Sequence, residues 1–228
     1  MADYEISDFL ESYATALGPE PDEIISEMGA QAREEGFPYV GPAVGGWLAM
    51  LARFSDAERV FEFGSGFGYS AYWFARELPA DGEVVLTEID AHELDQAREY
   101  MDRGGLADRA AFEHGDAIET VEDYEGPFDV VLIDCQKERY AAAFEAVREK
   151  VAPGGIVAAD NAVAGGSIDA GDLRSYFEGG GADGADRSGM NGMTEGIADY
   201  LDAVRATAGF ETTLLPLGEG VAISQRER

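Results

Sequence analysis

The sequence predicts an α/β fold in which helices cover both faces of a mostly parallel sheet that ends in an antiparallel hairpin. Three observations lead to this class. Short apolar runs bounded by turn residues, such as 130–133, are typical of parallel strands buried on both faces. These runs alternate with segments of helical periodicity, as in repeated β-α-β units. The last two runs, 210–215 and 221–224, are separated only by the turn-like 216–220, which indicates a hairpin.

The elements follow one another as a single domain over residues 1–228. Residues 1–55 hold two amphipathic segments and a third helix near 44–53, which we expect to cover the core. Strands are predicted at 59–63, 83–88, 110–113, 128–134 and 155–160, before the hairpin. Helices are predicted at 69–78, 92–103, 138–151 and 194–208.

The segment 162–192 is predicted to be a glycine-rich insertion loop. Nine of its thirty-one residues are glycine, including the run 179–181. Because it begins directly after polar residues at a predicted strand end, we interpret it as a mobile lid, with a disordered surface insertion as the alternative.

The charge of the chain argues against strongly anionic partners. Its 46 acidic and 16 basic residues give a formal net charge of −30, which repels nucleic-acid backbones and anionic membranes. Only two of the basic residues are lysines, Lys137 and Lys150. An acidic excess with scarce lysine suggests a halophilic protein whose carboxylates need counter-ions to stay compact.

We expect a soluble cytoplasmic protein. The single cysteine, Cys135, excludes an internal disulfide framework and is consistent with a reducing compartment. The sequence shows neither a secretory leader nor an apolar run long enough to span a bilayer.

Oxygen-bearing side chains follow two of the predicted parallel strands. Asp134 ends the run 130–133, and Asp160 and Asn161 end the run 156–159. A right-handed helical crossover between these strands would place them side by side, so that their carboxyl ends converge. Two carboxylates and an amide oxygen are hard ligands that suit Mg²⁺, so the sequence predicts a metal site made of Asp134, Asp160 and Asn161.

A glycine-rich turn after the first strand predicts a nucleoside-containing ligand. The turn, 62–70, has the spacing Gly-x-Gly-x-Gly and opens a helix, so that backbone amides face a ligand. Glu88 ends the next strand, where an acid can accept hydrogen bonds from ribose hydroxyls. Asp116 and Ala117 follow the third strand, near an adenine edge. Alternatively, Glu88 caps a helix or is solvated, and Asp116 is a helix N-cap.

Taken together, these motifs resemble the class I S-adenosylmethionine-dependent O-methyltransferases. The residues that carry the resemblance are 61–70, Glu88, 115–117, 134–140 and 160–161, and the similarity extends over roughly residues 40–224, including the ending 214–220. The paired motifs at Asp134 and at Asp160 and Asn161 point to the metal-dependent branch of catechol and caffeoyl-CoA O-methyltransferases.

The resemblance implies a Rossmann-like sheet of seven strands, six parallel and one antiparallel. It implies S-adenosylmethionine and Mg²⁺, or another hard divalent cation, as cofactors, and a small polyhydroxylated aromatic acceptor as the partner. It also allows a homodimer, for which the N-terminal helices are the candidate interface. The residues that it assigns to the cofactor are Val40, Glu62, Gly64, Gly66, Ser70, Glu88, Asp116, Ala117 and Asp134, the last shared with the metal.

Lys137 is the candidate general base. A vicinal diol could chelate the metal through both oxygens, which makes its hydroxyl more acidic and fixes one oxygen against the sulfonium methyl group. A neighbouring cation and partial burial favour the neutral amine that could then take the proton. A solvated lysine at a helix start is the alternative.

Three other functions remain open from the residues. Asp134, Asp160 and Asn161 could hydrogen-bond polar substrate groups in a metal-independent methyltransferase. An NAD-dependent oxidoreductase could use the same turn, although the Gly-x-Gly-x-Gly spacing disfavours it. A regulatory domain that only binds the cofactor is disfavoured by the complete set of predicted ligands and base.

Overall fold

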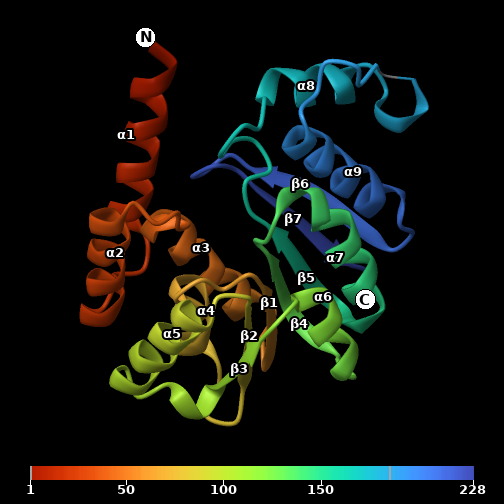
Figure 1. Ribbon diagram of the computed structural model, residues 1–228. Coiled ribbons are helices and arrows are strands. Elements are labelled where there is room, and N and C mark those ends of the chain that lie inside the picture. The colour runs from red at the N-terminus through yellow and green to blue at the C-terminus, as the bar shows by residue number, and fades with distance from the viewer. Residues whose placement is uncertain (1, 185) are drawn as a thin grey trace.

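The computed structural model describes residues 2–184 and 186–228, with side chains from residue 9 onward. Within this part of the chain, one seven-stranded sheet has the order β3-β2-β1-β4-β5-β7-β6 (Figure 1). The strands are β1 (Arg59–Phe63), β2 (Glu83–Glu88), β3 (Ala110–His114), β4 (Phe128–Ile133), β5 (Val151–Ala159), β6 (Phe210–Leu215) and β7 (Val221–Arg226). The first five run parallel, and β7 is antiparallel to both β5 and β6. The predicted fold class and its C-terminal hairpin are confirmed.

Helices cover both faces of the sheet. The α-helices are α1 (Ala2–Leu17), α2 (Glu23–Glu35), α3 (Gly41–Phe54), α4 (Tyr69–Glu77), α5 (Ala91–Arg103), α6 (Ala117–Thr120), α7 (Tyr140–Val147), α8 (Ala170–Glu178) and α9 (Gly192–Ala206). Short 3-10 turns are η1 (Ala107–Arg109), η2 (Val121–Asp123), η3 (Lys137–Arg139), η4 (Arg148–Lys150) and η5 (Gly181–Asp183).

The alternation of side chains along the strands divides the core into two layers. In β4, Val130 and Leu132 pack with α3, α4 and α5, whereas Val131 and Ile133 pack on the opposite face with α7 and α9. All four side chains are almost fully buried, which explains why this strand reads as a continuous apolar run. The carboxyl ends of β1, β2, β4 and β5 therefore lie at one edge between the two helical layers.

Side-chain caps fix where several helices begin. Asp or Asn at the N-cap accepts a hydrogen bond from a backbone amide in the first turn and satisfies one of the free helical donors. The capping residues are Asp22 for α2, Asp90 for α5, Asp116 for α6, Asp169 for α8 and Asn191 for α9.

Several details differ from the sequence-based expectations. The predicted helix 138–151 is divided into η3, α7 and η4, and β5 starts at Val151 rather than at residue 155. The strands β4 and β5 end one residue before Asp134 and Asp160, although the backbone amides of both aspartates still donate to neighbouring strands. The segment predicted as a loop, 162–192, contains α8.

The N-terminal helices pack differently from one another. The side chains of Ile25 and Met28 on α2 are buried, as is most of α3. Helix α1 extends away from the body (Figure 1), and its Phe9, Tyr13 and Leu17 are exposed. Over the described residues, none of the helices combines the length and apolar character needed to cross a bilayer.

Candidate functional site

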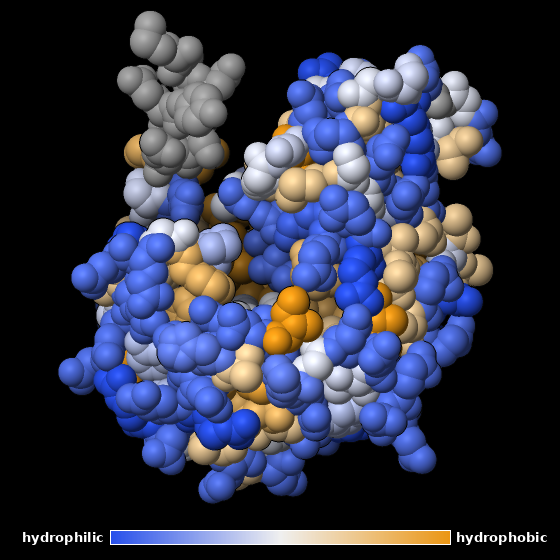
Figure 2. All heavy atoms as spheres, viewed as in Figure 1, coloured by the Kyte–Doolittle hydropathy of each residue, from blue (hydrophilic) through white to orange (hydrophobic). Residues whose placement is uncertain are grey.

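A cavity of about 520 Å³ lies at the carboxyl edge of the sheet. Crevices at this edge are where parallel α/β sheets bind ligands. The hollow is visible on a face that is otherwise mainly hydrophilic (Figure 2). Predicted site residues that line it are Val40, Gly64, Gly66, Ser70, Glu88, Asp116, Ala117, Asp134, Lys137, Asp160 and Asn161. Glu62 is the predicted site residue that is not part of the lining.

Gly64 and Gly66 occupy positions of the glycine turn where a side chain would overlap neighbouring residues. Gly64 and Gly66 have φ angles of 84° and 50°. A Cβ atom on Gly64 would overlap the carbonyl oxygen of Asp134, and one on Gly66 would lie 2.8 Å from the ring of Phe37. The glycines therefore let the turn approach β4 and leave its backbone open toward the cavity.

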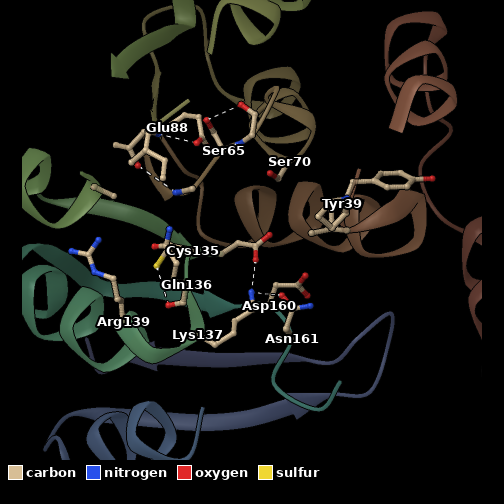
Figure 3. Close-up of a pocket in the computed structure, with 18 of the residues that line it drawn as sticks. Tyr39, Ser65, Ser70, Glu88, Cys135, Gln136, Lys137, Arg139, Asp160 and Asn161 are labelled. Carbon is tan, nitrogen blue, oxygen red and sulfur yellow. Dashed lines mark hydrogen bonds and ion pairs between the residues drawn. The ribbon is translucent and has the colours of Figure 1, made fainter. Parts of the chain in front are cut away.

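Glu88 fastens the end of β2 to this turn. One oxygen of its carboxylate accepts from the amide of Gly66 at 2.9 Å, and the other accepts from the amides of Ile89 and Asp90 at 2.8 and 3.0 Å. In Figure 3 Glu88 lies beside Ser65, across the cavity from Lys137. The carboxylate is thus fixed in place at the cavity wall, as a group that recognises a polar ligand must be.

Asp116 combines the predicted pocket position with its alternative as a helix cap. Its Oδ1 accepts from the amide of Ile118 at 2.9 Å, and its Oδ2 lies 2.7 Å from a guanidinium nitrogen of Arg139. The hydrogen bond from Arg139 is the main cause that lowers the pKa of Asp116. Arg139 has no role in the sequence-based prediction, although it lies within the motif 134–140.

Glu62 lies beneath the cavity floor and is fully buried. Burial is the main cause that raises its pKa to about 8, and Ser70 donates a hydrogen bond to its Oε1. Its Oε2 has no hydrogen-bond partner in the described part of the chain. Glu62 is therefore joined to the cavity lining through Ser70.

Two of the three predicted metal residues, Asp134 and Asn161, contact the side chain of Lys137. Its Nζ donates to Oδ1 of Asp134 at 2.9 Å and to Oδ1 of Asn161 at 2.5 Å. Figure 3 shows Lys137 reaching across the cavity edge toward Asp160 and Asn161. Oxygens from the ends of β4 and β5 therefore face one positive charge, as the convergence of the strands predicts.

Asp160 is the residue of this cluster whose ionised form is most clearly disfavoured by its surroundings. It is only 6% exposed, and within the described residues its Oδ1 has no hydrogen-bond partner. Burial, followed by repulsion from Asp134, raises its pKa to about 7. A cation would offset both effects, so the donor set fits a hard divalent ion.

Two further residues complete the cluster and were missed from the sequence. The hydroxyl of Tyr140 accepts from Lys137 Nζ at 2.7 Å and lies 3.4 Å from Oδ1 of Asp134. Glu219, in the turn between β6 and β7, accepts a hydrogen bond from Nδ2 of Asn161. Tyr140 lies within the motif 134–140 and Glu219 within the ending 214–220, but the sequence-based prediction assigned a role to neither. Among residues 2–184 and 186–228, no group of three or more His, Cys, Asp or Glu side chains is placed to hold a metal ion. The predicted ligand set differs from such a group because it combines two carboxylates with the amide of Asn161.

Comparisons with known proteins show which proteins this chain resembles. Residues 24–226 match the family described as O-methyltransferase. A catechol O-methyltransferase of Niastella koreensis is 34% identical over 158 residues, which cover 67% of this chain and 71% of that protein. Caffeoyl-CoA O-methyltransferase 2 of Petunia hybrida is 26% identical over 191 residues, which cover 80% of this chain and 74% of the relative.

A solved structure shares the fold along nearly the whole chain. The O-methyltransferase from Bacillus cereus, in complex with SAH, superposes with a TM-score of 0.82. The match covers 98% of this chain and 99% of that one, at 24% sequence identity.

Proposed function

The chain belongs to the O-methyltransferase family, and from this premise we propose that it methylates a hydroxyl group of a small polyhydroxylated aromatic acceptor with the help of Mg²⁺ or another hard divalent cation. Family membership confirms the predicted enzyme class, an S-adenosylmethionine-dependent O-methyltransferase. The observation that carries the proposal is the buried side-chain oxygen Oδ1 of Asp160, which has no hydrogen-bond partner among the described residues and belongs to the cavity wall that Asp134 and Asn161 also line.

S-adenosylmethionine would bind along the glycine turn. Gly64, Gly66 and Ser70 line the part of the cavity assigned to its methionine portion, with Val40 on the N-terminal side. Glu88 would accept hydrogen bonds from the ribose hydroxyls, and Asp116 with Ala117 would flank the adenine. This order follows the successive strands β1, β2 and β3 across the sheet.

Asp134, Asp160 and Asn161 would hold the divalent cation. The buried and unpartnered Oδ1 of Asp160 supports this assignment because a cation would satisfy it. When bound, such a cation polarises an acceptor hydroxyl and makes its proton easier to remove.

Lys137 would remove that proton. The hydroxyl proton passes to Nζ of Lys137, and the acceptor oxygen takes the methyl carbon as the carbon–sulfur bond of the sulfonium breaks and its electrons return to sulfur. To act as a base, the amine has to be neutral. Tyr140 would orient the amine through its hydroxyl, which lies 2.7 Å from Nζ.

One contact favours metal-independent transfer as the second candidate. The ammonium of Lys137 already neutralises Asp134 at 2.9 Å, so this carboxylate is paired without a metal. In that case Asp160 and Asn161 would hydrogen-bond the acceptor directly, and turnover would not respond to divalent cations.

The decisive experiment measures methylation of a panel of polyhydroxylated aromatics with Mg²⁺ and with excess chelator. We expect turnover with Mg²⁺ only, and we expect Asp160→Asn to abolish it while SAH affinity, measured by calorimetry, is retained. Asp81→Asn, a substitution of an exposed aspartate outside the cavity, serves as the matched control. Equal turnover in chelator and in Mg²⁺ would select the metal-independent candidate.

A further inference from the structure

The side-chain amide of Asn161 lies between two charged groups with opposite hydrogen-bonding character. Its Oδ1 faces Nζ of Lys137 at 2.5 Å, and its Nδ2 donates to Oε2 of Glu219. An ammonium only donates hydrogen bonds, and an ionised carboxylate only accepts them. Lys137 and Glu219 therefore require the same orientation of the Asn161 amide, with its oxygen toward Lys137 and its nitrogen toward Glu219. The two ends of a side-chain amide are almost identical in shape, so hydrogen bonds have to select the orientation.

We propose that Glu219 is a positioning residue that holds the oxygen of Asn161 toward the cation cluster. This inference rests on the proposed function, in which Oδ1 of Asn161 is a ligand of a divalent cation. A rotated amide would present its NH₂ group, which cannot coordinate a cation, toward Asp134 and Asp160. If Lys137 withdraws from Asn161, Glu219 is the remaining contact that fixes the orientation. Residues that orient a metal ligand in this way usually contribute strongly to metal affinity.

The backbone places Glu219 for this contact. The carbonyl oxygen of Glu219 accepts from the amides of Val163 and Ala164 at 3.1 and 2.9 Å. The carbonyl oxygen of Gly220 accepts from the amide of Ala162 at 2.7 Å. The turn between β6 and β7 is thus joined to the segment that directly follows Asn161, so the carboxylate and the amide are held in register.

Two features of the local backbone accommodate the hydrogen bond between Asn161 and Glu219. Asn161 has a φ angle of 56°, a left-handed conformation that asparagine tolerates better than most residues. Gly165 packs against the contact with a φ of 109°, and a Cβ atom there would overlap both the carboxylate of Glu219 and the amide of Asn161. The backbone on both sides is therefore shaped around this hydrogen bond.

A double-mutant cycle tests the proposal through Mn²⁺ binding, measured by calorimetry at high salt on the full chain. Glu219→Ala should weaken Mn²⁺ binding about tenfold or more, within the range known for residues that orient metal ligands. Glu211→Ala removes the same charge from an exposed glutamate of β6 and should leave Mn²⁺ affinity unchanged. SAH affinity should be equal in all variants, which shows that each is folded.

The second half of the cycle separates positioning from charge. An aspartate at position 161 presents oxygen on both sides and needs no orientation, so in the Asn161→Asp background Glu219→Ala should not weaken Mn²⁺ binding. The same loss in both backgrounds would show that Glu219 acts through its charge or by direct coordination, and would overturn the proposal. If the wild type and Glu219→Ala bind Mn²⁺ equally well, the role of Glu219 is overturned, but the proposed metal assistance is not. A wild-type protein that binds no Mn²⁺ would overturn the proposed metal assistance and this inference with it.

Discussion

The ammonium of Lys137 lies 2.5 Å from the side-chain oxygen of Asn161, although 24 positions separate the two residues in the chain. The contact joins the turn after β4 to the end of β5, and it exists because these two parallel strands are neighbours in the sheet. The only lysine of the cavity lining is thereby held against residues assigned to the cation. This relationship supports Lys137 as the base of the proposed reaction.

Lys137→Ala should lower kcat about 10²- to 10⁴-fold, which is the usual contribution of a general base. KM for the acceptor should change by less than about threefold, because Lys137 is assigned to the proton rather than to binding. Steady-state kinetics at saturating S-adenosylmethionine and Mg²⁺ would measure both values. Mn²⁺ affinity should not fall in this variant, because the ammonium competes with a cation for Asp134 and Asn161.

Lys150→Ala is the matched control for that experiment. Lys150 is the other lysine of the chain, and its Nζ donates a hydrogen bond to the carbonyl oxygen of Val121. Neither residue belongs to the cavity lining. We expect its kcat to equal that of the wild type. Full turnover of Lys137→Ala at neutral pH would remove Lys137 from the base role.

The sequence could predict the meeting of Asp134, Asp160 and Asn161 because strand ends are set by strong local signals. The apolar runs before these residues end abruptly, and neighbouring parallel strands end at the same edge. The glycine turn was recognisable for a similar reason, since Gly64 and Gly66 adopt backbone angles that few other residues tolerate.

Residues that contact the site from distant parts of the chain could not be predicted in the same way. Glu219 reaches Asn161 only because β7 inserts between β5 and β6, a placement that local sequence does not encode. Helix α8 did have a signal, since Asp169 is an N-cap and Leu173, Tyr176 and Phe177 have helical spacing. The glycines around it obscured that pattern.

Gly45→Ala should destabilise the protein because α3 and α4 are in close contact at this position. A Cβ atom on Gly45 would overlap the indole of Trp73, which is fully buried. Overpacking of this kind outweighs the better helix propensity of alanine, so we expect a net loss of about 1–2 kcal/mol in the free energy of unfolding.

Urea denaturation at fixed salt would measure that loss. Gly189→Ala is the control, because a Cβ atom there meets only open space and the backbone is not left-handed. We expect Gly189→Ala to change stability by less than about 0.5 kcal/mol. Equal stability of both variants would contradict the close packing of α3 on α4.

The net charge of −30 predicts that salt stabilises the fold. Screening at roughly 3 M KCl should raise the thermal midpoint above its value at roughly 0.1 M, because repulsion between exposed carboxylates extends over about one Debye length. KCl is preferred to sulfate, which strengthens apolar burial in any protein. Identical midpoints at the two concentrations would refute the halophilic interpretation.

Glu62 predicts a specific dependence of stability on pH. In the folded protein burial raises its pKa to about 8, whereas in the unfolded chain a glutamate ionises near about pH 4.3. Between these values the unfolded state loses a proton that the folded state keeps. The contribution of Glu62 to stability therefore falls as pH rises, by at most about 1.4 kcal/mol per pH unit, and becomes constant above the folded pKa.

Glu62→Gln removes this titration and keeps the shape of the side chain. Relative to the variant, the wild type should lose stability steadily from about pH 5 to about pH 8, as measured by urea denaturation without cofactor at fixed high salt. Glu122→Gln, at an exposed site, should follow the wild-type profile. Parallel profiles of wild type and Glu62→Gln would mean that the Glu62 carboxyl is ionised in the folded protein, and a charged group could then persist beneath Ser70 only if a cation or water reached its second oxygen.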